Sequence, residues 1–158
     1  MPDRSDHILK MVPEGGILFF ATFARVEFTL KYCGYLRDTN GAQADWHKLD
    51  DRLGDGFFEQ ICTSDQANTL ISSPPKMQIC SNGSLEWRQM PPVNNTRALF
   101  DAVRRVRNNL FHGGKSGHPD DDSVNQKRNK KLIAEAQWVL EQAMKQSDEM
   151  IHIFNGRF

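Results

Sequence analysis

The sequence has no excess charge of either sign, no export signal and no hydrophobic run as long as a membrane span. Its 158 residues carry 20 Lys and Arg against 20 Asp and Glu, so the chain lacks the overall basic character of many nucleic-acid-binding proteins. The N-terminus does not have the cationic and then apolar layout of a signal peptide. We expect one cytoplasmic domain over residues 1–158 that makes no contact with a membrane, with residues 1–16 as a loose lead-in. This length suffices to bury a core.

Cysteine is scarce, and its spacing excludes two kinds of site. The three cysteines, Cys33, Cys62 and Cys80, are odd in number and widely separated. They provide neither a disulfide framework nor the paired spacing of a zinc site, so we expect buried thiols. No other metal-ligand spacing stands out, and we expect no metal and no cofactor.

The most apolar segment, residues 17–37, has two possible readings. Its apolar side chains repeat at spacings of four and three, which predicts a helix facing a core. Residues 25–32 alternate strictly between polar and apolar, which alone is typical of a strand. The length of the segment and the absence of a breaker favour the helix.

Three further segments complete the predicted fold. Residues 46–61 have a helical apolar stripe that Gly54 and Gly56 should interrupt. Between the proline pairs of residues 74–92, Asn82-Gly83 predicts a small β-hairpin. A long last helix is expected from Ser123, where Ser123 and Gln126 fit a capping box, to Phe154. The fold class is therefore all-α, a bundle of about four main helices with a small β-hairpin insertion.

Residues 95–118 contain an amphipathic helix with an abrupt end. Four apolar residues, Leu99, Val103, Val106 and Leu110, form a narrow stripe that should face the core. Asn95 or Thr96 can cap the start, and Gly113-Gly114 should end the helix directly after His112.

The opposite face of this helix mixes aromatic and cationic side chains. Phe100 and Phe111 lie among Arg97, Arg104 and Arg107 in the helical projection. This composition is typical of a protein interface or a nucleic-acid site. Exposed single apolar residues are also common, so an ordinary surface remains possible.

The spacing of Arg107, Asn108 and His112 resembles the signature of the HEPN family, helical domains that bind nucleotides or cleave RNA. An arginine, a polar residue directly after it and a histidine after four intervening residues carry the resemblance. It implies a metal-independent endoribonuclease that acts by attack of the RNA 2′-hydroxyl. Arg107, Asn108 and His112 would be its catalytic residues.

The resemblance also implies a homodimer that places two copies of the motif across one cleft, with Phe100 and Phe111 at the interface. Such a protein would be the toxic or defence component of a bacterial system, and an antitoxin or another regulatory protein could be its partner. In some members a partner enzyme modifies a tyrosine two residues after the histidine. That position is Gly114 here, so the chain does not have the residue that this control requires.

Positive charge is concentrated around and after this helix. Between Arg97 and Lys131 there are nine Lys and Arg against four Asp and Glu. Lysines and arginines near a helix N-terminus oppose the helix dipole, so the cluster at the start of the last helix could serve an RNA ligand or be a solvated face. The predicted RNA-binding residues are Arg104, Lys115, Lys127, Arg128, Lys130 and Lys131.

A second function fits the same residues. A non-catalytic HEPN-like module that binds a nucleotide or RNA, or only dimerises, would use Arg107 and His112 as ligands or as a structural helix end. Resemblance to a fold does not by itself establish an activity.

Overall fold

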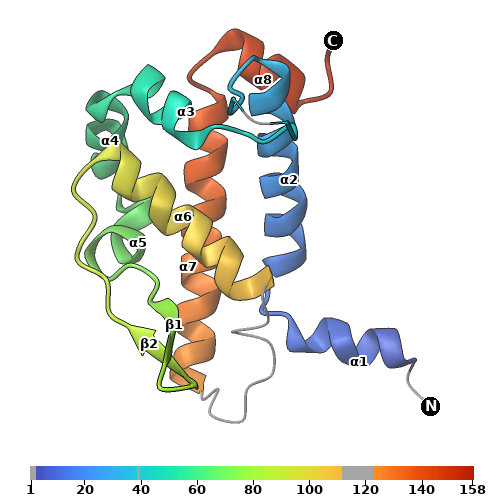
Figure 1. Cartoon of the computed structure of the whole chain (residues 1–158), viewed down its shortest axis with the longest axis vertical. Helices are drawn as coiled ribbons and strands as arrows, with labels where there is room; N and C mark the ends of the chain where they lie inside the picture. The colour runs from blue at the N-terminus through green and yellow to red at the C-terminus, as the bar shows by residue number, and fades with distance from the viewer. Residues whose placement is uncertain (1–2, 39, 112–122) are drawn as a thin grey trace.

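The computed structural model of the chain describes residues 3–38, 40–111 and 123–158. Within these ranges it has eight α-helices and one antiparallel hairpin (Figure 1). The helices are α1 (Arg4–Met11), α2 (Gly16–Tyr32), α3 (Trp46–Leu53), α4 (Asp55–Cys62), α5 (Asn68–Ser72), α6 (Thr96–Phe111), α7 (Ser123–Met144) and α8 (Asp148–Phe154), and a 3-10 turn, η1 (Asp65–Ala67), precedes α5. The mostly helical fold with a small hairpin is as predicted. The arrangement is more complex than four main helices.

Helix α7 is the central element of the fold. It contacts α2, α5, α6 and α8, and Figure 1 shows α2 and α6 lying against it. The predicted stripes of these three long helices form the core. Their buried members include Phe19, Val26 and Leu30 of α2; Leu99, Val103, Val106 and Leu110 of α6; and Ile133, Ala136, Leu140 and Ala143 of α7.

Helix α2 resolves the ambiguity of residues 25–32 in favour of the helix. A strand would place Val26, Phe28, Leu30 and Tyr32 on one face. Instead Val26 and Leu30 are fully buried, whereas Phe28 is 39% and Tyr32 is 57% exposed. Spacings of three and four residues therefore decide which side chains of this segment are buried.

Gly54 separates α3 from α4, as its position in the apolar stripe predicts. Its φ of 63° is a conformation that side-chain-bearing residues avoid. The hydroxyl of Thr96 donates to the Gly54 carbonyl at 2.6 Å, so the break also fixes the start of α6. Asn95 caps α6, because its Oδ1 accepts from the Ala98 amide at 2.8 Å.

The hairpin joins β1 (Met77–Ser81) to β2 (Ser84–Arg88) through the predicted two-residue turn. Asn82 and Gly83 both have positive φ, 49° and 77°, as a type I′ turn requires. All of β2 is exposed, so the hairpin forms one edge of the molecule rather than part of the core.

Two predicted segments differ in the structure. Residues 4–11 are a helix rather than a loose lead-in, although none of its side chains is buried. The expected last helix is interrupted, because Ser147 leaves the helical conformation and its hydroxyl accepts from the Met150 amide to cap α8. The capping box expected from Ser123 and Gln126 involves a side chain outside those described.

One charged side chain is buried in the helical core. Glu135 of α7 is buried, and its two carboxylate oxygens accept from the amides of Thr69 and Leu70 at 3.1 and 2.8 Å. It therefore caps α5 from another helix.

The expectation of buried thiols was wrong for Cys62 and Cys80, which are exposed.

Candidate functional site

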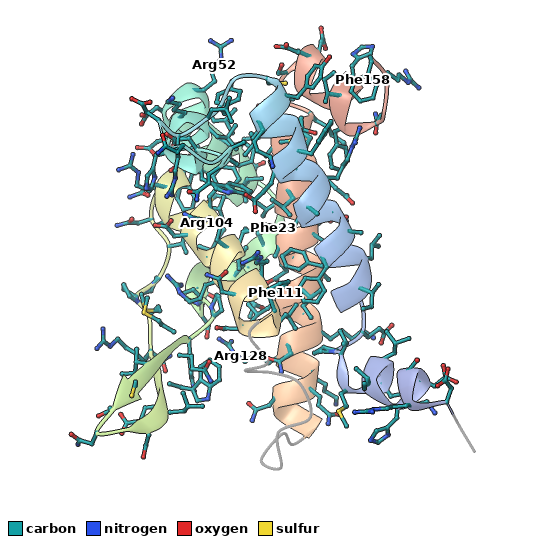
Figure 2. The ribbon with its side chains drawn as sticks, turned by 45° about the vertical axis from the view of Figure 1, so that its right-hand side comes forward. Phe23, Arg52, Arg104, Phe111, Arg128 and Phe158 are labelled. Carbon is teal, nitrogen blue, oxygen red and sulfur yellow. The ribbon has the colours of Figure 1, made fainter. Side chains whose placement is uncertain are left out.

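Three of the predicted site residues lie together on one side of α6. Because the apolar stripe of α6 faces the core, Arg104, Arg107 and Asn108 are directed towards α2 and the segment before α3. Figure 2 shows Arg104 beside the upper part of α6 and Phe23 and Phe111 between α6 and α2. The sequence therefore predicted correctly that these three residues share one face.

These residues line an open pocket with two cations that sequence analysis missed. Lys31 of α2 and Arg37 from the segment after α2 lie on its far wall. The single carboxylate among the described lining residues is that of Glu27. Four cationic side chains against one carboxylate make the pocket suitable for an anion such as phosphate. Lys31 and Arg37 come from about 70 residues earlier in the chain, and no local pattern marked them.

Arg107 is held by two aromatic rings. Its guanidinium carbon lies 4.6 Å from the ring centre of Phe111 and 5.4 Å from that of Phe23. Its Nη1 donates to Oδ1 of Asn108 at 3.0 Å. Cation–π contacts of this kind orient a guanidinium without neutralising its charge. Arg107 is therefore positioned for an anion, and Asn108 orients it.

Arg104 is partly neutralised. Its Nη1 lies 3.6 Å from a carboxylate oxygen of Asp101, one turn earlier on α6, and its guanidinium lies 6.0 Å from the ring centre of Trp46. The pair is half exposed, so solvent screens it and its contribution to stability is small. An incoming phosphate would compete with Asp101 for this arginine.

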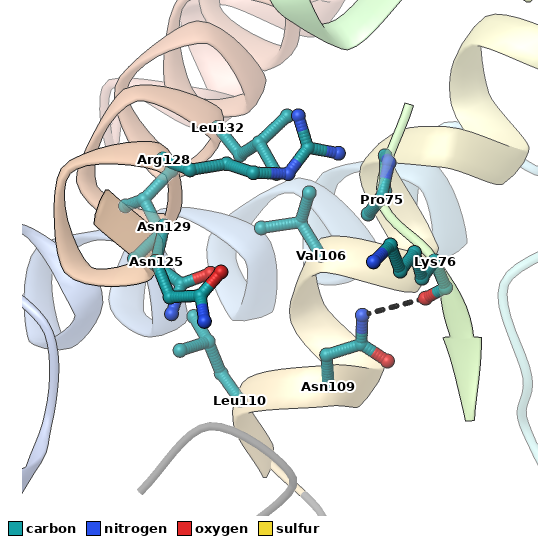
Figure 3. Close-up of a pocket in the computed structure, with 10 residues that line it drawn as sticks. Pro75, Lys76, Val106, Asn109, Leu110, Asn125, Arg128, Asn129 and Leu132 are labelled. Atoms are coloured by element: carbon teal, nitrogen blue, oxygen red, sulfur yellow. Dashed lines mark hydrogen bonds between the residues drawn. The ribbon is translucent and has the colours of Figure 1, made fainter. Parts of the chain in front are cut away.

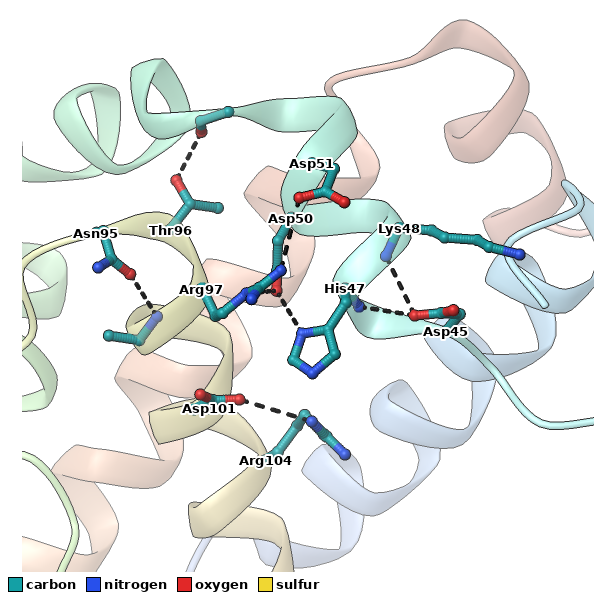
Figure 4. A network of polar contacts seen from close by, with 12 residues as sticks. Asp45, His47, Lys48, Asp50, Asp51, Asn95, Thr96, Arg97, Asp101 and Arg104 are labelled. Atoms are coloured by element: carbon teal, nitrogen blue, oxygen red, sulfur yellow. Dashed lines mark hydrogen bonds and ion pairs between the residues drawn. The ribbon is translucent and has the colours of Figure 1, made fainter. Parts of the chain in front are cut away.

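A second polar network joins α3 to the first turn of α6 (Figure 4). Oδ2 of the buried Asp50 lies 3.1 Å from Nδ1 of His47 and 3.5 Å from Nε of Arg97. Oδ1 of Asp50 is buried and has no hydrogen-bond partner among the described residues. Desolvation raises the pKa of the Asp50 carboxyl, and the hydrogen bond from His47 opposes this shift.

The raised pKa of Asp50 predicts a pH dependence of stability. Between the ordinary value of 3.8 and the raised value, the folded chain binds more protons than the unfolded chain. The contribution of Asp50 to the free energy of unfolding should therefore fall as pH rises through this window. In urea titrations at constant ionic strength, wild type should lose stability relative to Asp50→Asn as pH rises from below 3.8 to neutral.

The charged groups around Asp50 define the control for this prediction. His47, Arg97, Asp51 and Asp101 face the network, and His47 is the hydrogen-bond partner of the Asp50 carboxylate. The comparison should therefore be repeated in a His47→Gln background, where its sign should persist. If the free energy of unfolding of wild type instead rises relative to that of Asp50→Asn as pH rises, the ion pairs of Asp50 outweigh its desolvation.

Phe100 is not at an interface, and this prediction was wrong. It is 1% exposed, and its ring stacks on Phe57 with 5.5 Å between centres and 4° between planes. Helix α6 packs on α7 and also on α3 and α4, so its buried surface is wider than the four-residue stripe. Phe111, in contrast, is 62% exposed and touches Phe20 edge-on at 6.1 Å.

The predicted basic cluster of α7 divides into different roles. Arg128 donates to the carbonyls of Ser73 and Pro74 at 2.8 and 3.0 Å and to the Ser73 hydroxyl, so it holds the segment before β1. Its predicted role in RNA binding stays a prediction. Lys130 pairs with Glu14 at 2.8 Å, whereas Lys127 and Lys131 are exposed.

Not all of the predicted site can be compared with the structure. His112 and Lys115 lie outside the described residues, and α6 is described to Phe111. The pocket of Arg104, Arg107 and Asn108 does not include the cluster on α7, whose Arg128 lines a different pocket. Arg107 and Asn108 of the predicted motif can thus be placed, whereas its histidine lies outside the described residues.

Two general comparisons complete the description of the site. Among the described residues, no group of three or more His, Cys, Asp or Glu side chains is placed to hold a metal ion, and no helix is long and apolar enough to cross a membrane. Comparison with protein-family models, with curated proteins and with solved structures found no match.

Proposed function

We propose that the chain is a metal-independent endoribonuclease whose site is completed by a second copy of the chain. The observation that carries this proposal is the pocket in which Arg104, Arg107 and Asn108 lie opposite Lys31 and Arg37. Its charge and openness suit the phosphates of an extended strand. A mononucleotide ends in a phosphate that its site must enclose. A phosphate within a strand can be bound in an open pocket such as this one.

The chemistry needs a fixed cation and a proton-transfer group. Cleavage of RNA by its own 2′-hydroxyl forms a bond from this oxygen to phosphorus and breaks the bond to the 5′-oxygen of the next nucleotide. Arg107 can bind two oxygens of the crowded phosphate through its planar guanidinium. His112 would take the 2′-hydroxyl proton or protonate the leaving oxygen, because histidine exchanges protons near neutral pH.

Dimerisation would supply the second proton-transfer group. One chain has one such histidine in the motif, whereas the reaction needs both a base and an acid. Apolar surface for an interface is present: Phe111 is exposed beside Arg107, and α1 and the start of α2 expose large apolar side chains. Those in α1 and at the start of α2 are Ile8, Leu9, Met11, Ile17 and Leu18.

The biological setting follows from an RNA-cleaving activity. An endoribonuclease of this type would be harmful when unrestrained, which agrees with a toxin or defence component and with control by an antitoxin or other regulatory protein. The same exposed apolar surfaces could bind either a second copy or such a protein.

The test is cleavage of RNA by the purified chain in the presence of a chelator. We expect activity to persist in excess EDTA and to leave 2′,3′-cyclic phosphate and 5′-hydroxyl ends, which treatment with phosphatase and kinase can identify. Activity that is lost in EDTA and restored by a divalent cation would overturn the mechanism, as would 5′-phosphate ends.

One observation favours a second candidate, a module that binds RNA or nucleotides without cleaving them. None of the described histidines lines the pocket of Arg107, so the described part of the site has phosphate-binding groups without a proton-transfer group. The same experiment separates the candidates. A module of this kind would retain RNA in a gel-shift assay and leave its length unchanged.

A further inference from the structure

A second pocket lies on the other side of α6. It is formed by the C-terminal half of α6, the N-terminal half of α7 and residues 75–76 just before β1 (Figure 3). Val106 and Leu132 give it an apolar floor, and Lys76 and Arg128 lie at its rim. None of the described lining residues carries a carboxylate. A cationic ligand would find no opposite charge among these residues, whereas a neutral or anionic ligand would fit.

One buried amide in this pocket has no partner. Asn129 is 6% exposed, and its Nδ2 is fully buried without a hydrogen bond to any described residue. A buried donor of this kind lowers stability unless something pairs with it, and native proteins seldom keep one without a reason. The ligand should therefore present an acceptor to Asn129.

A second amide in the pocket is held in a fixed orientation. Nδ2 of Asn109 donates to the carbonyl of Lys76 at 3.0 Å, so its Oδ1 points away from that bond (Figure 3). An amide oxygen accepts two hydrogen bonds. Figure 3 shows the Asn109 oxygen directed away from Asn129, so of these two amides Asn129 is the one that offers a free hydrogen-bonding group to the pocket.

The guanidinium of Arg128 forms a flat wall of the pocket. Its bonds to the Ser73 and Pro74 carbonyls fix its plane, and Figure 3 shows it across the pocket from Asn109. A fixed guanidinium is a good stacking surface for an aromatic ring. A planar ring with apolar faces and a hydrogen-bond acceptor at its edge would use the floor, the wall and the donor of Asn129.

The two pockets are connected across α6. A shallow hollow between them is lined by Arg104 and Asn108, which belong to the pocket of Arg107, and by Asn109, which belongs to the second pocket. Met77, Gln78, Arg105 and Asp101 also line this hollow, and Asp101, the partner of Arg104, is the one carboxylate among its described lining residues. A single strand can therefore pass from one pocket to the other over the face of α6.

We infer that the pocket of Asn109 and Asn129 binds a nucleobase of the RNA whose phosphate lies at Arg107. This inference rests on the proposed function and adds the group that selects the substrate. Asn129 donates to a ring nitrogen or carbonyl of the base, and Arg128 stacks on its face.

Binding of the four nucleoside 5′-monophosphates to the full-length chain tests the inference, with ribose 5-phosphate as the matched probe that lacks a base. Isothermal titration should detect at least one nucleotide that binds at least tenfold more tightly than ribose 5-phosphate, which can use only the phosphate-binding pocket. Asn129→Leu, of similar volume, should weaken nucleotide binding at least tenfold. Because it removes an unpaired buried donor, it should not lower the melting temperature. Asn68→Ala, at an exposed amide of α5, should bind as wild type does.

Asn129→Asp is the second variant, and it keeps the shape while replacing the donor by an acceptor. It should change which nucleotide binds best. Equal binding of ribose 5-phosphate, or Asn129 variants that are folded and bind as wild type does, would overturn the inference even if the chain cleaves RNA. Asn129-dependent nucleotide binding without any RNA cleavage would support the pocket and reject the nuclease.

Discussion

Arg107→Ala and His112→Ala should each lower the rate of RNA cleavage by about 10² to 10⁴. Removing a positioned donor or a proton-transfer group from a transition state typically has an effect of this size. Single-turnover rates with excess protein measure the loss without a contribution from product release. Arg107→Lys keeps the charge but not the planar fork, and it should recover only a small part of the rate.

Arg52→Ala is the matched control, because Arg52 is an exposed arginine on α3 and Figure 2 shows it far from Arg104 and Phe111. Its rate should equal that of wild type. A loss of less than tenfold in His112→Ala would remove that residue from the mechanism. Full activity in Arg107→Ala would show that the pocket of Arg107 takes no part in cleavage.

Mixing experiments extend this prediction to the dimer. If both chains contribute to one cleft, an inactive double variant of Arg107 and His112 should poison wild-type chains on exchange. At equal amounts about a quarter of the dimers are fully wild type, by random pairing. Activity should approach that fraction, whereas independent sites would leave one half.

Phe100→Ala should reduce the free energy of unfolding by about 3 to 5 kcal/mol, the usual cost of truncating a buried phenylalanine. Its ring is 1% exposed and stacks on Phe57, so the deletion leaves a cavity that three helices cannot easily fill. Urea unfolding followed by circular dichroism measures the change.

Phe111→Ala, on the same helix, provides the comparison. Phe111 is 62% exposed, so its loss should cost about 1 kcal/mol or less in the monomer. If Phe111 lies at the dimer interface, the variant should instead weaken association in sedimentation experiments. Similar stability losses in both variants would contradict the burial described for α6.

Features that depend on residues close together in the sequence were predicted, whereas contacts between distant segments of the chain were missed. The stripe of α6, the break at Gly54 and the turn at Asn82 and Gly83 depend on neighbouring residues, and all three were predicted. Phe100 was misplaced because a helical projection assumes one packed face, and α6 has a wider one.

The candidate site follows the same division. Arg104, Arg107 and Asn108 share a helix, so their shared face could be predicted. Lys31 and Arg37 reach the pocket only through the packing of α2 on α6. In the sequence Arg128 is one of several cations at the start of a helix. Only the position of the Ser73 and Pro74 carbonyls shows that it holds the segment before β1.

The carboxylate of Glu135 has a consequence for the order of folding. Helix α5 is only five residues long, too short to form alone in water, and its N-terminal amides bond to a side chain 65 positions further along the chain. Closing a loop of that length costs entropy before the bonds form. Helix α7 must lie against α5 before Glu135 can cap it. Helix α5 should therefore be among the last parts of the native structure to form and, when α7 moves away, among the first to be lost.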